Sequence, residues 1–559
     1  MRLSRRDLLA AIAASVFTPA CGKSSLGKCC ANWALPEAAL PPPELLPLCG
    51  VPVTRERIFA FDEIRYATPT VYRPKNAGDI ASILCFARQA HRRVTVRGGG
   101  NSFDGQSLND DIVIQMGKGF AHVGCPDQDD HGFFIEVGAA ATWWDVLKKL
   151  APLGLFPPSM ATAGSAMVGG TLSADCVSRM SCTTGKEGAQ VRWFEMVLMD
   201  GSTVACLRND PDADRQRLFN AVIGGFGYLG IITKVCFDLM VVRSYANTPG
   251  ENPVVLTRST RYGSFVDWDE LLLMLNQKGR QSRIEYERTR DRSRAAVHDP
   301  SKAMAPAWPA LSIPVFLSGP GLGANLFEQG FGDHRPLKRT PGGVFTTDSN
   351  FIAEAEYATS WFPTLIEFAV DLGCPQGEFV DELFGWAFFL GNSTSRAKAN
   401  AHCANPRERL NFNQQSFALP AGPNEDAPDT RATRRFMELL VGRLHACGLR
   451  PVDIDLLYVP PDEFLMSASN NLPSYLVTIA FSNVNAPVMP AVLNDFLCDA
   501  SRDCRLLGGR VHLVKNIVAD PADLRAMYGD AAREMLRLKS AYDPTGVLRN
   551  EFFGRVFET

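Results

Sequence analysis

The fold is decided by the stretch Val94-Thr95-Val96-Arg97-Gly98-Gly99-Gly100-Asn101-Ser102-Phe103-Asp104-Gly105-Gln106-Ser107-Leu108. A β-branched run predicts a strand, and it stops at three consecutive glycines followed by small polar side chains. Glycine lacks a Cβ, so its backbone can approach another molecule closely, and successive N–H groups in such a turn can hold an anion. A glycine-rich hairpin without a ligand has the same pattern, so this turn alone leaves both interpretations open.

Two more glycine-rich turns follow in the same half of the chain. In Met167-Val168-Gly169-Gly170-Thr171-Leu172-Ser173-Ala174 a glycine pair opens a predicted helix. Gly224-Gly225-Phe226-Gly227-Tyr228-Leu229-Gly230 joins a predicted helix to a predicted strand that contains Ile232. Three such turns together favour one elongated ligand that carries phosphate, because each can hold an anion on its backbone.

The totals are those of an ordinary globular chain. Its 559 residues carry a formal net charge of −3, and 46% of them are hydrophobic. A near-balanced charge gives no support to nucleic-acid binding, which calls for a basic face. No apolar run reaches the length of about twenty residues that spans a bilayer. No spaced cysteine and histidine set predicts a metal site.

The N-terminus has the pattern of an export signal. Arg5 and Arg6 precede an apolar run over residues 8–17, and small residues follow near Ala20. We interpret residues 1–22 as a twin-arginine signal, read by the twin-arginine export machinery, which predicts a periplasmic or secreted protein. Residues 23–59, rich in proline, alanine and leucine, are expected to form an N-terminal arm.

Residues 60–240 resemble the FAD-binding domain of the vanillyl-alcohol-oxidase type, or PCMH-type, flavoproteins. Arg97-Gly98-Gly99-Gly100-Asn101-Ser102 corresponds to that family's Arg-Gly-x-Gly-His-Ser loop. Val168-Gly169-Gly170-Thr171-Leu172-Ser173 and Gly230-Ile231-Ile232-Thr233 match its second and third signatures. The histidine that many members bond to the flavin is replaced here by Asn101, so the resemblance implies FAD held non-covalently.

The resemblance also implies the fold and the residues that bind the cofactor. It predicts an α+β protein: a two-subdomain FAD-binding domain, an α+β substrate domain with an antiparallel sheet over residues 241–505, and a C-terminal segment, 506–559, that returns to the flavin. The residues expected to bind FAD are Arg97, Gly98, Gly99, Gly100, Asn101, Ser102, Phe103, Gln106, Ser107, Met167, Val168, Gly169, Gly170, Ser173, Val177, Ile232 and His512.

The C-terminal segment is similar to that of the sugar-oxidising members: aldonolactone oxidases, alditol oxidases and decaprenylphosphoryl-ribose oxidase. In that group the lysine at the position of Lys515 lies beside the flavin and the reacting carbon. His512 precedes Lys515 by three residues, and on a strand this spacing puts the side chains on opposite faces unless a bulge intervenes. We therefore expect His512 to contact the flavin rather than to act as the base. Glu356, beside Glu354 and Tyr357, is a candidate base.

The expected function is that of an exported FAD-dependent oxidase or dehydrogenase. It would oxidise a CH–OH group of a small molecule, a sugar, polyol, lactone or other alcohol, and pass electrons to oxygen or another acceptor. One alternative is CH–NH oxidation, because cytokinin dehydrogenases share the Gly-Gly-Thr-Leu-Ser motif and the glutamine at Gln106. Another is a non-catalytic flavin-bearing binding protein.

Overall fold

The computed structural model describes the FAD-binding region and the C-terminal part of the chain. The described residues are 48, 50–62, 65–150, 153, 155–161, 165–177, 181–241, 412–449, 451, 453–482 and 491–558, with four short strands between 256 and 352 and Leu272. Glu354, Glu356, Tyr357 and the N-terminal segment 1–22 lie outside them. No described helix is both long and apolar enough to cross a membrane.

The stretch that carries the first glycine turn begins as β5, an edge strand of a small sheet. The strand order of this sheet is β1-β4-β6-β5. β4 and β5 each pair with β6 in parallel, and the helix α2 connects β4 to β5. Asn76 caps α2 by accepting from the backbone N–H of Asp79, and the face that carries Ile80, Ile83, Leu84 and Ala87 is buried. The elements are β1 (Val53–Arg55), β4 (Thr70–Tyr72), α2 (Ala77–Gln89), β5 (Val94–Arg97) and β6 (Ile112–Gln115).

The other two glycine turns lie next to a second, antiparallel sheet, whose order is β11-β10-β12-β8-β7. β10 and β11 form a hairpin, and Gly201 at its tip has a φ of +88°. The helix α4 contains the second glycine turn, and the third turn leads into β12. The elements are β7 (Asp127–Asp129), β8 (Gly132–Gly138), α3 (Trp143–Leu150), α4 (Val168–Ser173), α5 (Ser181–Thr184), β10 (Val191–Val197), β11 (Thr203–Leu207), α6 (Ala213–Val222) and β12 (Ile231–Asp238).

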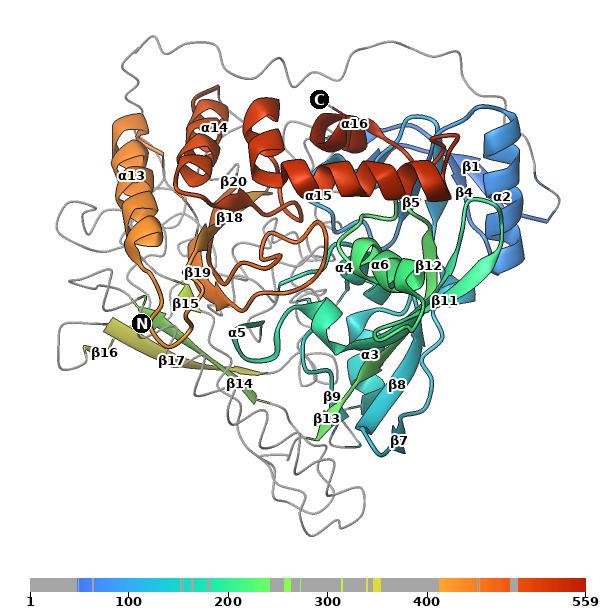
Figure 1. Cartoon of the computed structure of the whole chain (residues 1–559), viewed down its shortest axis with the longest axis horizontal. Helices are drawn as coiled ribbons and strands as arrows, with labels where there is room; N and C mark the ends of the chain where they lie inside the picture. Colours follow the sequence, from blue (N-terminus) through green and yellow to red (C-terminus); the bar gives the residue numbers. More distant parts are fainter. Residues whose placement is uncertain are drawn as a thin grey trace, which may run out of the picture. The chain divides into compact units, whose positions relative to one another are not determined.

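A third sheet belongs to the expected substrate domain and is antiparallel, in the order β15-β19-β20-β18-β21. Its edge strand β21 comes from the C-terminal segment, which therefore adds itself to this sheet. The helices α13 and α14 lie beside it, and α15 runs across from it towards β5 (Figure 1). The elements are β15 (Ile313–Pro314), β18 (Phe412–Pro420), α13 (Arg431–Cys447), β19 (Asp453–Val459), β20 (Ser474–Ser482), α14 (Ala491–Leu506), β21 (Arg510–Val511), α15 (Pro521–Tyr542) and α16 (Glu551–Phe557).

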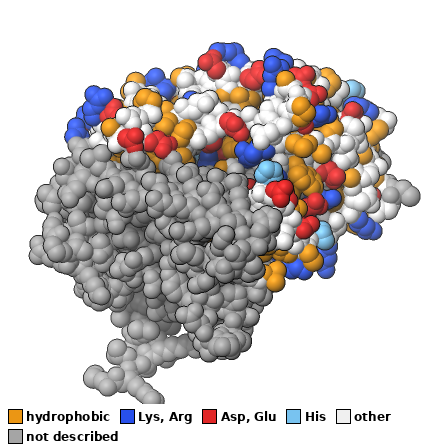
Figure 2. Space-filling model, turned by 60° about the horizontal axis from the view of Figure 1, so that its bottom comes forward, with side chains coloured by type: hydrophobic (Ala, Val, Ile, Leu, Met, Phe, Trp, Pro, Cys, Tyr) orange, Lys and Arg blue, Asp and Glu red, His pale blue; other side chains and the backbone are white. Residues whose placement is uncertain are grey.

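Mixed helices and antiparallel sheets confirm the predicted α+β class. On the face drawn in Figure 2, basic and acidic side chains are interspersed over the described surface. The remaining elements are β2 (Ile58–Phe59), β3 (Tyr66–Ala67), η1 (Gly105–Ser107), η2 (Lys118–Phe120), β9 (Leu155–Phe156), η4 (Glu187–Gln190), β13 (Met240–Val241), β14 (Leu256–Tyr262), β16 (Lys338–Arg339) and β17 (Phe345–Ile352).

Candidate functional site

The three glycine turns meet at one cavity, whose far wall comes from β18, β19, β20 and the segment after β21. Most of the residues expected to bind the cofactor line it, although they come from separate parts of the chain. They are Gly98, Gly99, Gly100, Asn101, Ser102, Phe103, Gln106, Ser107, Met167, Gly169, Gly170, Ser173, Val177, Ile232 and His512, and the predicted catalytic Lys515 is with them.

Two of the expected cofactor residues support the cavity from behind instead. Arg97 donates to the backbone oxygen of Phe59 at 2.8 Å and to the hydroxyl of Ser107 at 3.1 Å. Its guanidinium fills the space under Gly100, where the φ of +76° favours glycine. Val168 is buried, and its N–H donates to the backbone oxygen of Ala141 at 2.9 Å. Both residues therefore shape the turns.

The first turn has the free donors that an anion needs. Within the described part of the chain, no backbone or side-chain group accepts from the N–H groups of Gly99, Gly100, Asn101 or Ser102. The side-chain oxygen of Asn101 is buried and also has no partner among the described residues. Buried polar groups are nearly always paired, so this turn fits a polar ligand such as a phosphate.

The second turn places its two glycines on opposite sides of α4. A Cβ on Gly169 would come within 2.6 Å of the Cβ of Ala139, so this glycine is required for packing against the end of β8. A Cβ on Gly170 would have nothing within 4 Å and would point into open space. Gly170 thus keeps clear a part of the cavity that a ligand can fill.

The far wall divides into polar and apolar parts. Gln414 and Ser416 project from β18, and the Ser416 hydroxyl bonds to that of Thr478 on β20 at 2.7 Å. Leu457 and Leu476 supply the apolar part. Such a lining, mostly apolar with a few convergent polar groups, is typical of small-molecule sites.

His512 and Lys515 line the same cavity, so the expectation of opposite faces is wrong. The reason is that β21 ends at Val511, and residues 513–515 form a turn instead of continuing the strand. The turn brings both side chains to one side. The ammonium nitrogen of Lys515 lies 4.3 Å from the centre of the Phe103 ring, a cation–π contact.

The surroundings of His512 favour the neutral form of its imidazole. It is 4% exposed, and burial lowers its pKa well below the usual value, with the charges of Lys186 and Lys515 acting in the same direction. Its Nδ1 has no hydrogen-bond partner among the described residues. A neutral ring donates one hydrogen bond and accepts one, so His512 can serve a flavin or a substrate in either role.

A buried ion cluster lies beneath this wall. The Lys186 ammonium is 2.5 Å from a carboxylate oxygen of Asp175 and 2.9 Å from one of Asp462. Burial and the charge of Asp462, against the opposing effect of Lys186, raise the pKa of Asp175 to about 6. The cluster joins the loop after α4 to the loop between β19 and β20, and thus holds the two walls together.

The described ranges contain no group of three or more His, Cys, Asp or Glu side chains that could hold a metal ion. Comparison with known proteins identifies the ligand class instead. A family profile described as FAD binding domain matches residues 68–207, which include the first two glycine turns. This part of the chain is an FAD-binding domain of the PCMH type. The predicted family, fold class and cofactor are thereby confirmed.

Relatives of the FAD-binding domain carry the name cytokinin dehydrogenase. Cytokinin dehydrogenase 5 of Arabidopsis thaliana is 30% identical over 30% of this chain and 31% of its own length. Cytokinin dehydrogenase 3 of Oryza sativa subsp. japonica is 32% identical over 34% of this chain and 37% of its own. Cytokinin dehydrogenase 5 of the same rice is 33% identical over 40% and 42%. The alignments span between three and about four tenths of these curated relatives.

Two residues that line the cavity bear on covalent attachment of the flavin: Asn101, at the position of the flavin-linking histidine, and Cys176. Asn101 has an amide, which is not a nucleophile. Cys176 also lines the cavity, but burial raises the pKa of its thiol well above the ordinary value. Because the thiolate is the reactive form, the raised pKa lowers the reactivity of this thiol.

Several residues that line the cavity were missed by sequence reasoning. Gly227 and Gly230 lie in the third turn, which was recognised without assigning these two to the site. Gln414, Ser416 and Thr478 lie in a region with no local motif. The one signal for Gln414 and Ser416 is a run of polar residues, 413–416, within a strand that is buried from Asn413 to Leu419. Glu356 lies outside the described residues and stays a prediction.

Proposed function

We propose that the protein is an FAD-dependent oxidoreductase that oxidises a CH–OH group of a sugar, polyol, lactone or other alcohol. The observation that carries the proposal is the convergence of the three glycine turns and Lys515 on one cavity. Bound FAD would supply the ring that accepts a hydride from the substrate carbon, and the chain would supply position and electrostatics. The unpaired backbone donors of the first turn and the open space at Gly170 fit its diphosphate.

Lys515 gives the cavity a fixed positive charge. A cation in a site shielded from water stabilises negative charge more strongly than the same cation in solution. Lys515 would therefore stabilise the charge that the reduced cofactor gains, or would orient the substrate hydroxyl. The surroundings of His512 favour its neutral form, so its ring can contact the cofactor or accept a hydrogen bond without adding a second charge.

The polar part of the far wall favours a hydroxyl-bearing substrate. Gln414 offers an amide donor and acceptor, and Ser416 and Thr478 offer hydroxyls that both donate and accept. All three come from neighbouring positions of paired strands, where the backbone ladder fixes their spacing. Glu356 remains the candidate for the base that withdraws the substrate proton.

The second candidate is oxidation of a CH–NH group. The names of the relatives favour it, since each of those described above is called a cytokinin dehydrogenase. The alignments span at most about four tenths of those proteins, so they speak for the flavin domain more than for the substrate wall. A non-catalytic flavin-bearing binding protein is the remaining alternative, and a cationic side chain in the cavity counts against it.

The test is a substrate screen of the FAD-loaded full chain with a dye acceptor, using matched panels of alcohols and of secondary amines. Turnover of alcohols with little turnover of amines is the expected result. Amine turnover alone would reverse the order of the two candidates. Repeating the screen with oxygen as the acceptor separates an oxidase from a dehydrogenase.

We also propose that the protein is exported in folded form with its cofactor. The paired Arg5 and Arg6 before an apolar segment support this proposal. Cell fractionation should find the full chain in the periplasm or the medium, and replacing both arginines by lysine should keep it in the cytoplasm. Equal distribution of the two forms would contradict export by the twin-arginine route.

A further inference from the structure

Gln106 lines the cavity, but its side-chain amide bonds to protein atoms. Its amide nitrogen donates to the backbone oxygen of Leu513 at 3.0 Å and to that of Lys515 at 3.1 Å. Its amide oxygen accepts from the N–H of Asp104 at 2.9 Å. Both hydrogens of the amide are thus committed, which leaves no donor for a ligand. Gln106 is 6% exposed, so water does not compete for these bonds.

The carbonyls that Gln106 holds belong to the turn that carries Lys515. Residues 513–515 lie outside any helix or strand, so no ladder fixes them. A lysine side chain is a flexible four-carbon stem, and its charge is only as well placed as its backbone. At the other end of that stem, the ammonium lies over the ring of Phe103, three residues before Gln106. The loop that carries the first glycine turn therefore contacts Lys515 twice: Gln106 bonds to its backbone oxygen, and Phe103 lies against its ammonium.

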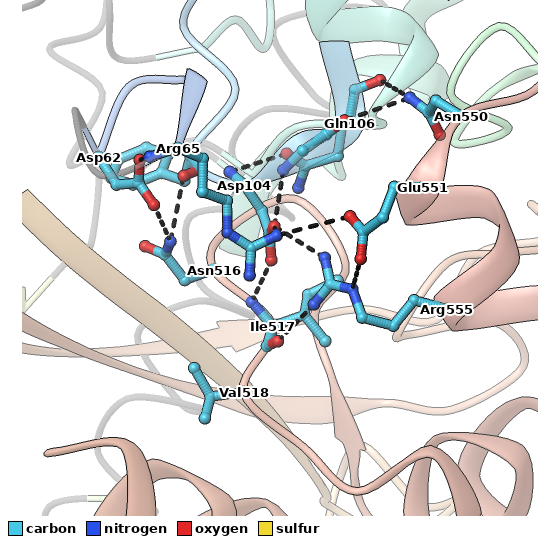
Figure 3. Close-up of polar contacts among 12 residues, drawn as sticks. Asp62, Arg65, Asp104, Gln106, Asn516, Ile517, Val518, Asn550, Glu551 and Arg555 are labelled. Carbon is cyan, nitrogen blue, oxygen red and sulfur yellow. Dashed lines mark hydrogen bonds and ion pairs between the residues drawn. The ribbon is translucent and has the colours of Figure 1, made fainter. Parts of the chain in front are cut away.

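The same loop holds the residues that follow Lys515. The Asn516 amide donates to Asp62 and to the backbone oxygen of Phe103, both at 3.1 Å, and the N–H of Ile517 donates to Asp104 at 3.0 Å. Figure 3 shows these bonds converging from the loop and the C-terminal segment on one buried network. Hydrogen bonds thus fix the backbone or side chain of four of the five residues from Leu513 to Ile517.

We propose that Gln106 and Phe103 are positioning residues for Lys515, so that the loop that cradles the cofactor also sets the place of the cation beside it. This inference rests on the proposed function. It assigns Gln106 a role different from the one implied by the family resemblance, which was cofactor binding. A change at Gln106 then acts on the flavin through Lys515, and has no effect of its own once Lys515 is gone.

The midpoint potential of bound FAD tests this, because it needs no substrate. Lys515→Met should lower the potential, since a nearby cation favours the reduced form. Gln106→Leu keeps the volume but removes both donors, and misplacement of a charged group should shift the redox equilibrium about tenfold, or about 30 mV for a two-electron couple. Phe103→Leu should shift it about threefold. In the Lys515→Met background both shifts should vanish.

Gln415→Leu is the matched control. Gln415 is another buried glutamine that donates to a backbone oxygen of this segment, that of Val518, at 3.2 Å, and accepts from the N–H of Val518 at 2.8 Å. It contacts no carbonyl of the turn, so the control should lower thermal stability and leave the potential unchanged. If Gln415→Leu shifts the potential equally, the effect of Gln106→Leu comes from a nonspecific loss of order in the C-terminal segment. That result would overturn the inference.

The remaining outcomes separate the inference from the proposed function. If Lys515→Met leaves the potential unchanged and turnover intact, the proposed role of Lys515 fails. If Lys515→Met lowers the potential and neither Gln106→Leu nor Phe103→Leu does, the inference alone fails. It fails equally if Gln106→Leu shifts the potential, or weakens FAD binding, by the same factor in both backgrounds, since Gln106 would then act on the flavin directly.

Discussion

Replacing Asp104 by asparagine should destabilise the protein strongly. Asp104 is fully buried, forms an ion pair with Arg65, and accepts from Arg555 at 2.8 Å, Gly105 at 2.6 Å and Ile517 at 3.0 Å. Burial opposes its ionisation, but Arg555 and Arg65 outweigh burial and hold its pKa below the ordinary value. The carboxylate is thus the centre of the network in Figure 3.

The expected cost follows from what asparagine leaves behind. Two arginines lose their buried counter-charge and keep the half-exposed Glu551, in a site where both arginine side chains are less than a fifth exposed. An amide N–H also replaces an acceptor. Breaking a buried ion pair costs about 3–5 kcal/mol. Because the Asp104 pKa is depressed in the folded state, its contribution is present above the unfolded pKa of about 3.9 and is lost as the pH falls further. In strong acid the free energies of unfolding of Asp104→Asn and the wild type should therefore become equal.

Urea unfolding followed by tryptophan fluorescence, at neutral pH and near pH 3, measures this. Asp238→Asn is the control: Asp238 pairs with Arg192 at 2.5 Å but is 41% exposed, and exposed pairs contribute less than about 1 kcal/mol. The variant should also bind FAD more weakly than the control does. Asp104→Asn with the stability and FAD affinity of Asp238→Asn would refute the reasoning.

Three further predictions concern the walls of the cavity. Gly169→Ala should destabilise the fold by about 1–3 kcal/mol through overlap with the end of β8, whereas Gly170→Ala should keep or slightly raise the melting temperature and weaken FAD binding at least tenfold, as a fluorescence titration would show. Lys186→Met should cost about 3–5 kcal/mol in urea unfolding, because two carboxylates lose their buried partner. Glu187→Gln should stabilise the protein at pH 8 and not at pH 4: burial raises the Glu187 pKa well above normal, so its contribution is present below the unfolded pKa of about 4.3 and lost as the pH rises. Equal melting temperatures of wild type and Glu187→Gln at pH 8 would count against that cause.

The sequence was sufficient to predict most of the residues of the first two glycine turns that line the cavity. A glycine turn is a local feature: Gly100 needs its positive φ and Gly169 its close approach to β8 whatever the rest of the chain does. Turns of this kind can be recognised from neighbouring residues alone. The export signal stays a prediction, since residues 1–22 lie outside the described part of the chain.

The substrate wall could not be predicted, because it depends on pairing between distant strands. Ser416 meets Thr478 only through the register of β18 and β20, which no short pattern encodes. The prediction that His512 and Lys515 lie on opposite faces was wrong for a related reason. The directions of their side chains depend on the residue at which β21 ends. Gln106 looked like a cofactor residue from its position in the loop, and its true partners lie some four hundred residues away.

The central claim is that three glycine turns and the C-terminal turn around Lys515 form a site for non-covalent FAD. The most direct measurement is the flavin content of the purified full chain before and after acid precipitation. We expect one FAD per chain, all of it released into the supernatant. A correctly folded, colourless chain that takes up no added FAD would contradict the account, and flavin that stays with the precipitate would contradict the low reactivity of Asn101 and Cys176.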